Sequence, residues 1–187
     1  MVPIVDRAQA LAESELAAEV PRRWSHVQAV AAKAAEVAES LLDGSDTAIV
    51  VAAAWLHDVS YGPRVANTGF HSLDGARWLR RQGFDERVAA LVAHHSCAQR
   101  EADERGLDDD LAWEFEHEAS PVSDVLWYAD MTTGPDGQSL DVTVRLGEIR
   151  TRYGVGDVVT RFISRAEPEI VAAVHRVEER LRAMGGG

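Results

Sequence analysis

Apolar residues recur every three or four positions along most of the chain, the spacing that places side chains on one face of an α-helix. After Pro21, the apolar positions include Val27, Val30, Val37 and Leu41. Proline suits the first position of a helix, because its missing N–H would have no partner there. The pattern therefore predicts a helix over residues 21–42.

The same spacing, with turn and capping residues, predicts helices in the rest of the chain. They cover residues 4–20, 45–58, 71–82, 85–95, 121–130, 140–153 and 157–184. We expect caps at Ser45-Asp46 and Ser120, and a kink or split in the last helix at Pro168. No strand pattern persists and no repeat appears, so the sequence predicts an all-α fold in a single domain.

The segment 97–119 differs from the rest because it is crowded with aspartate and glutamate. Runs of like charge are usually solvated. We therefore expect a surface insertion, helical around 111–115, with a lid over a binding site as the alternative.

The composition excludes several classes of protein. The chain has 187 residues, 46% of them hydrophobic, and a formal net charge of -12, which argues against binding nucleic acid through its phosphates. No apolar run approaches the roughly 20 residues of a membrane-spanning helix, and the N-terminus does not resemble a signal peptide. Cys97 is the only cysteine, so no intrachain disulfide can form and we expect a cytoplasmic location.

The first indication of a functional site is a pair of adjacent ionisable residues. The segment from Ala48 to Leu56 is almost entirely apolar, and it is followed directly by His57 and Asp58. Burying an unpaired charge costs several kcal/mol. A bound metal ion would offset that cost, provided that the chain supplies further ligands.

Further candidate ligands occur at or near the ends of the predicted helices: His26, His71, His95 and Asp130. His95 lies on the apolar face of its helix. His94 projects about 100° away from that face and is the weaker alternative. Four histidines and two aspartates on five helices can therefore converge on one cleft.

Imidazole and carboxylate ligands together suit a borderline metal such as Fe, Mn, Co, Ni or Zn. Because Asp58 has two oxygens, it can bridge two ions, and ions roughly 3.5–4 Å apart can clamp a phosphoryl group and activate water. We therefore predict a divalent transition-metal cofactor, with two ions, in which iron or manganese is preferred over nickel, cobalt or zinc.

These residues resemble the HD superfamily of metal-dependent phosphohydrolases over most of residues 20–135. The signature is His26, then His57-Asp58, then Asp130 within WYAD. The stretch FHSLDGARWL at 70–79 resembles the His-x-x-x-Gly-Ala element of dinuclear members, and LVAHHS at 91–96 resembles their second histidine element. The resemblance implies a helical bundle. It does not cover the first helix (4–20) or the helices over 140–184, which we expect to pack on the metal-site core.

Carried over, the resemblance assigns His26, His57, Asp58 and Asp130 to one metal, and Asp58, His71 and His95 to a second. Several dinuclear relatives also carry a basic residue shortly after the His-Asp pair, where it contacts substrate phosphate. This chain has Val59-Ser60-Tyr61-Gly62 there. The candidates for that contact are Arg64, Arg77 and Arg81.

The function predicted is hydrolysis of a phosphomonoester or phosphodiester in a small, nucleotide-like phosphorylated substrate. Asp58 would hold the ions, and Asp130 would orient the water or take its proton. Two alternatives remain: a mixed-valent di-iron oxygenase, which some HD-fold proteins with this ligand set resemble, and a non-catalytic metal-binding helical module.

An apolar stripe runs along the last predicted helix. Its members are Ile170, Val174, Val177, Leu181 and Met184. We expect this stripe to pack on the domain's own core, with a homodimer contact as the alternative.

Overall fold

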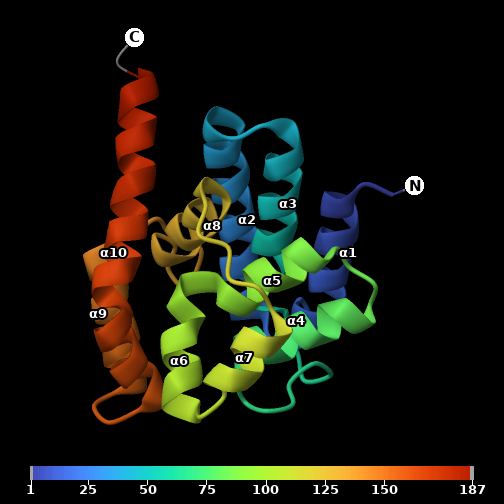
Figure 1. The fold of residues 1–187 in the computed structure, drawn as a ribbon, viewed down its shortest axis with the longest axis vertical. Coiled ribbons are helices and arrows are strands. Elements are labelled where there is room, and N and C mark those ends of the chain that lie inside the picture. Colours follow the sequence, from blue (N-terminus) through green and yellow to red (C-terminus); the bar gives the residue numbers. More distant parts are fainter. Residues whose placement is uncertain (1, 186–187) are drawn as a thin grey trace.

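The computed structural model describes residues 2–185, which form the predicted all-α fold with no strand in that range (Figure 1). The α-helices are α1 (Ile4–Leu16), α2 (Pro21–Leu41), α3 (Gly44–Leu56), α4 (His71–Arg81), α5 (Glu86–His94), α6 (Ala98–Arg105), α7 (Asp108–Glu114), α8 (Pro121–Met131), α9 (Val142–Tyr153) and α10 (Val158–Gly185). Short 3-10 helices cover Val59–Tyr61 and His95–Cys97.

The main apolar core is centred on α3, which packs against α1, α2, α5 and α8. A helix that is apolar on nearly all sides has to be surrounded by other elements. From Val50 to Leu56 every residue except Trp55 is buried. The C-terminal end of α3, where the His-Asp pair follows, is consequently held in the interior.

The two C-terminal helices form a second apolar cluster against the end of α8. Leu146 and Ile149 of α9 pack there with Phe162 and Ile163 of α10 and with Met131. Trp127 and Tyr128 of α8 contact both clusters. Helix α8 therefore joins the two halves of the core, and it carries Asp130.

Two predicted helix ends shift by a few residues. Helix α1 ends at Leu16 instead of residue 20, since Val20 precedes Pro21 and the residue before proline is disfavoured in helical conformation. Helix α3 is capped by Asp43, whose side chain accepts hydrogen bonds from the backbone N–H groups of Ser45 and Asp46. The expected cap at Ser45-Asp46 was thus placed two residues late.

Helix α10 continues through Pro168 and is not split there. An internal proline costs about 3 kcal/mol in a helix. Phe162 and Ile163 before it, and Ile170 and Val174 after it, are all buried. Packing on both sides of the proline therefore offsets its local cost.

The expectation of a solvated insertion over 97–119 was wrong in part. The segment folds into α6 and α7, and it buries Ala102, Leu111 and Phe115 in the main core. Most of the acidic residues lie on the outer faces of these short helices. The few apolar residues between them determine how the helices pack.

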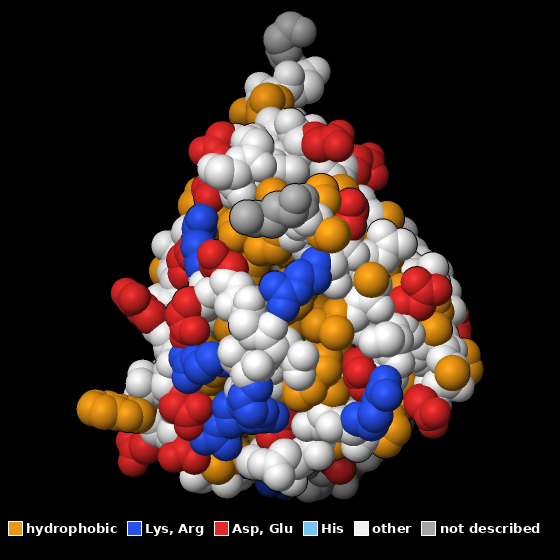
Figure 2. All heavy atoms as spheres, turned by 90° about the vertical axis from the view of Figure 1, so that its right-hand side faces the viewer, with side chains coloured by type: hydrophobic (Ala, Val, Ile, Leu, Met, Phe, Trp, Pro, Cys, Tyr) orange, Lys and Arg blue, Asp and Glu red, His pale blue; other side chains and the backbone are white. Residues whose placement is uncertain are grey.

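Acidic and basic side chains alternate over the face that carries α1, without an extended basic surface there (Figure 2). Among the described helices, none is long and apolar enough to cross a membrane.

Candidate metal centre and its cavity

The six predicted ligands come together in the interior, although they lie on different elements. His26 belongs to α2, His57 and Asp58 follow α3, His71 begins α4, His95 follows α5, and Asp130 lies near the end of α8. All are buried except His71, which is partly exposed. The interior position of α3 and the contacts of α2, α5 and α8 with it explain this convergence.

One group of donor atoms is formed by His26, His57 and Asp58, whose atoms lie within 4.8 Å of one another. His57 Nε2 is 3.3 Å from Asp58 Oδ2, and His26 Nε2 is 3.8 Å from the same oxygen. Asp130 Oδ1 adds a further donor, 3.1 Å from His26 Nε2 and 3.8 Å from His57 Nε2.

A second group is formed by Asp58, His71 and His95. His71 Nε2 is 3.7 Å from Asp58 Oδ1 and 3.2 Å from His95 Nε2. The two oxygens of Asp58 thus face different groups, Oδ2 toward the first and Oδ1 toward the second. This is the arrangement required of a carboxylate that bridges two cations.

Backbone carbonyls determine which ring nitrogens face the site. His26 Nδ1 donates to Gly134 O, His57 Nδ1 to Ala54 O, and His95 Nδ1 to Val92 O, at 3.0, 2.8 and 2.6 Å. A neutral imidazole that donates from Nδ1 keeps a lone pair on Nε2. These Nε2 atoms point into the two donor groups.

The residues fit a divalent transition metal. His57 Nε2 is fully buried and has no hydrogen-bond partner, and an orphaned imidazole nitrogen beside carboxylates is the environment that a cation satisfies. The mixed nitrogen and oxygen donors are those that borderline metals prefer.

Charge in the first group is shared between carboxylates and imidazole. Burial alone would raise the pKa of Asp58, but the Arg23 guanidinium and the His57 ring hold it well below its usual range. Burial likewise opposes ionisation of Asp130, but the neighbouring rings of His26 and His57 outweigh it and lower the pKa. Burial disfavours a charged His57, but Asp58 raises its pKa to about 9 when no metal takes the place of the proton.

In the second group the pKa values of the imidazoles are lowered, whereas the pKa of His57 in the first group is raised. Burial and the neighbouring His95 lower the pKa of His71 to about 3, and burial together with His57 lowers the pKa of His95. Both rings are therefore neutral near pH 7, the form in which histidine binds metals.

Ser96 is a site residue that the sequence did not indicate. Its hydroxyl donates a hydrogen bond to Asp130 Oδ2. Ser96 and Cys97 both have positive φ, 48° and 62°, a conformation that costs non-glycine residues about 1–3 kcal/mol each. The strained turn after His95 directs Ser96 toward Asp130. The sequence does not predict this turn, because positive φ angles are usually adopted by glycine or asparagine and not by serine or cysteine.

His94 is also buried, but it serves a different contact. Its Nε2 bonds with Phe115 O at 2.9 Å, and its ring packs against His117. His95, by contrast, lies within the second donor group.

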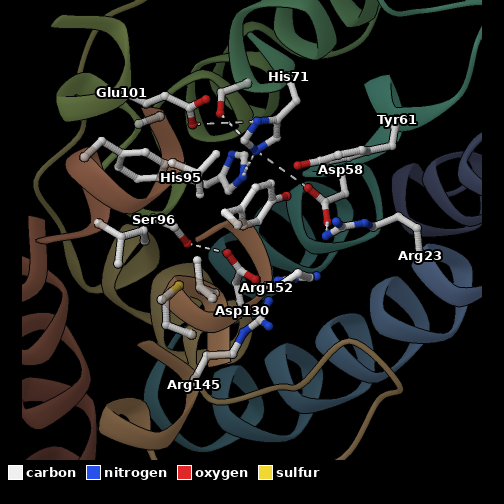
Figure 3. A pocket seen from close by; sticks show the side chains of 18 of the residues that line it. Arg23, Asp58, Tyr61, His71, His95, Ser96, Glu101, Asp130, Arg145 and Arg152 are labelled. Carbon is white, nitrogen blue, oxygen red and sulfur yellow. Dashed lines mark hydrogen bonds and ion pairs between the residues drawn. The ribbon is translucent and has the colours of Figure 1, made fainter. Parts of the chain in front are cut away.

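A cavity of about 270 Å³ opens beside the two donor groups (Figure 3). Asp58, His71, His95 and Asp130 line one part of it. Arg23 also lines it: one of its guanidinium nitrogens, Nη1, lies 2.6 Å from Asp58 Oδ2.

Arg23 is a basic residue beside the His-Asp pair that the sequence did not indicate. Its guanidinium stacks over the Tyr61 ring at 4.0 Å. The available signal was the spacing of three residues between Arg23 and His26, which places both on one side of α2.

The three arginines predicted for substrate binding do not line this cavity. Arg64 is paired with Glu15, Arg77 with Glu114 and Asp110, and Arg81 is exposed. For Arg77 the reason is helical geometry, since a residue six positions after His71 points about 120° away from it.

Glu101 is a second polar residue that the sequence did not single out. It is buried, its Oε2 lies 3.9 Å from His71 Nδ1, and it forms an ion pair with Arg105 at 2.6 Å. Burial raises the pKa of Glu101, although Arg105 opposes that effect. Its place in an acidic segment concealed it among solvated carboxylates.

Comparison with known families identifies the core. The model of the HD domain family matches residues 23–132. The chain belongs to the HD domain family. Members of this family are generally metal-dependent hydrolases that bind divalent ions, and the matched range contains all six candidate ligands. No curated protein and no solved structure matches the chain significantly.

Proposed function

We propose that this HD domain protein is a phosphohydrolase that cleaves a phosphomonoester or phosphodiester bond in a small substrate, with two divalent ions. The observation that carries the proposal is one cavity that is lined by the Arg23 guanidinium and by candidate ligands from both donor groups: Asp58, His71, His95 and Asp130. Carboxylate and imidazole ligands suit the metals, and a guanidinium suits the phosphoryl oxygens.

The ligands divide between the proposed ions as their positions indicate. His26, His57, Asp58 and Asp130 would hold one, and Asp58, His71 and His95 the other. When bound, the ions would supply Lewis-acid activation of water and neutralise charge on the phosphoryl group.

Asp130 is proposed to orient the attacking water. Its lowered pKa keeps the carboxylate ionised, so it accepts a hydrogen bond from water but is a weak proton acceptor. Because Ser96 Oγ donates to Oδ2 and His26 contacts Oδ1, the direction of the carboxylate is set by groups on both sides.

Arg23 is proposed to hold a phosphoryl oxygen of the substrate. In the structure its Nη1 contacts Asp58 Oδ2. The same oxygen would also bind a metal ion if Asp58 bridges two ions. A guanidinium beside the metal ligands is well placed to exchange that carboxylate contact for substrate oxygens, which it binds in a two-pronged manner.

The test is hydrolysis of p-nitrophenyl phosphate and bis(p-nitrophenyl) phosphate by protein loaded with Mn²⁺ or Fe²⁺. We expect turnover by the wild type, and background rates for His57→Ala and Asp58→Asn. The exposed His175→Ala is the matched control and should retain full activity. Turnover that survives in Asp58→Asn would contradict the proposal, as would oxygen consumption by the iron-loaded protein without any phosphoester hydrolysis.

A further inference from the structure

One wall of the cavity is built by helices that lie outside the HD match. The residues that α9 and α10 contribute include Arg145, Ile149, Arg152, Tyr153, Phe162 and Ile163. On α9, positions 145, 149 and 152 follow the i, i+4, i+7 spacing of a single helix face. That face of α9 points into the cavity, opposite the metal ligands (Figure 3).

Arg145 has an unsatisfied hydrogen-bonding group in this wall. The residue is only 3% exposed, and its Nε is buried without a partner. Glu148 accepts a hydrogen bond from Nη1, and it is the one carboxylate within ion-pair distance of Arg145 among residues 2–185. Figure 3 shows the guanidinium directed toward Asp130 inside the cavity. Leaving a buried charged donor unpaired is costly, and an anion in the cavity would satisfy it.

Within α9 itself, the positive charge of the wall exceeds the negative charge paired with it. Arg152 Nε is 3.3 Å from Glu148 Oε1, so both arginines share the single carboxylate of Glu148. Glu148 does not line the cavity, whereas both arginines do. The wall therefore presents a net cationic surface to whatever occupies the cavity.

Apart from Tyr153, the remainder of the wall is apolar. Ile149 of α9 and Phe162 and Ile163 of α10 are buried, and no charged residue of α10 lines the cavity. The volume of about 270 Å³ lies just below the range of about 300–1,000 Å³ that is usual for ligand pockets. A compact apolar group fits against Ile149, Phe162 and Ile163, whereas a sugar and a base would place polar atoms against these apolar side chains.

We propose that α9 and α10 form the specificity subsite of this protein: Arg145 and Arg152 bind the anionic oxygens of the substrate, while Ile149, Phe162 and Ile163 contact a compact apolar body. The preferred substrate is then a small phosphomonoester with an aryl or short alkyl group, and not a nucleotide. The reaction on this substrate rests on the proposed hydrolase function, but the binding does not.

Calorimetric binding of phenylphosphonate, which phosphoester hydrolysis cannot cleave, tests the subsite on the full chain loaded with Mn²⁺. Charge-assisted hydrogen bonds are among the stronger ones, so we expect Arg145→Gln and Arg152→Gln each to raise Kd by about tenfold or more. Arg150→Gln is the matched control on the same helix. Arg150 pairs with Glu167 and does not line the cavity, so its Kd should equal that of the wild type.

Phe162→Ala separates the apolar contact from the anion contact. It should weaken phenylphosphonate binding and leave binding of inorganic phosphate unchanged. Arg152 is less buried than Arg145, with 27% of its side chain exposed, so its variant keeps the test valid should Arg145→Gln fail to fold. Thermal melting establishes which variants are folded.

The outcomes distinguish the subsite from the hydrolase. Binding that depends on Arg145 or Arg152, in a protein that hydrolyses no phosphoester, would support the subsite and refute the hydrolase. Hydrolysis by a protein whose phenylphosphonate affinity is unchanged in both arginine variants would refute the subsite alone. Tighter binding of adenosine monophosphate than of phenylphosphonate would also overturn the proposed substrate class.

Discussion

Asp58 lies beside four side chains, an arginine and three histidines, in the interior of the protein. Its Oδ2 accepts from Arg23 and faces the rings of His57 and His26, while its Oδ1 faces His71. A carboxylate that is 3% exposed is retained only where charge is balanced. Arg23 provides part of that balance, and a metal between the histidines would provide the remainder.

Ser96 gives a prediction at the scale of a single hydroxyl. In Ser96→Ala the hydrogen bond to Asp130 Oδ2 is lost, so the carboxylate should be less well oriented. Loss of such an outer contact to a metal ligand typically costs about 10–100-fold in metal affinity or activity. We expect a loss of that size in the Kd for Mn²⁺, measured by calorimetric titration of metal-free protein.

The control is Ser40→Ala, because Ser40 is exposed and bonds only within its own helix. It should bind Mn²⁺ as the wild type does. A Ser96→Ala protein with unchanged metal affinity and unchanged turnover would show that the strained turn serves no role at Asp130.

The sequence predicted individual site residues only where they belong to a recognisable motif. His57 and Asp58 stand out because ionisable residues end an apolar helix. Arg23 and Glu101 do not stand out, because an arginine in the first turn of a helix and a glutamate in an acidic segment are usually surface residues. Packing alone places Arg23 beside Asp58 and Glu101 beside His71.

At the scale of elements, α10 shows how a stripe divides between the core and solvent. Ile170, Val174 and Val177 are buried in the protein's own core, whereas Met184 is 61% exposed. Figure 1 shows the C-terminal end of α10 extending beyond the other helices. The expected packing on the domain's own core thus covers most of the stripe, and a homodimer contact remains an untested prediction.

Ile170→Ala should destabilise the protein by about 2–5 kcal/mol, as expected for removal of a fully buried aliphatic side chain. Met184→Ala is the control, and it should change stability by less than about 0.5 kcal/mol. Urea unfolding followed by circular dichroism measures both.

Equal effects of the two substitutions would contradict the packing of α10. If Met184→Ala instead lowers the mass seen in analytical ultracentrifugation from dimer to monomer, the exposed end of the stripe is an interface between copies.

At the scale of the whole molecule, the buried site connects stability to pH and to metal. The folded protein without metal keeps His71 and His95 neutral and His57 protonated. An unfolded histidine titrates near about 6.5. Each of these shifts therefore makes stability depend on pH.

The sign differs between the two kinds of histidine. For His71, whose pKa falls to about 3, the unfolded state binds more protons between the two pKa values, so stability rises with pH up to about 6.5. For His57, whose pKa rises to about 9, the folded state binds more protons, so stability is lost as pH rises from about 6.5 through its folded pKa. The lowered pKa values of Asp58 and Asp130 remove further stability as pH falls below about 4.

We therefore expect the Tm of metal-free protein to be highest near about pH 6.5 and to fall on both sides. Loading with Mn²⁺ should raise Tm and maintain it above that pH, since a ligand that binds only the folded state stabilises it and metal replaces the proton on His57. Calorimetric scans of chelated and loaded protein between pH 5 and about 9 measure this. A Tm that is independent of both chelation and pH would mean that the cluster binds no metal.

The sequence by itself determined the all-α class and the six candidate ligands. Helix periodicity is a local property, and the ligands lie in short motifs at helix ends. Only the tertiary structure decided that Arg23, Ser96, Glu101, Arg145 and Arg152 surround these ligands and that Arg64, Arg77 and Arg81 do not. The physical reason is that the packing angle and rotation of α9 and α10 against α8 depend on side chains distant in sequence, such as Met131, Leu146 and Phe162. No local pattern specifies which face of a helix is turned toward a cavity built by helices far away in the chain.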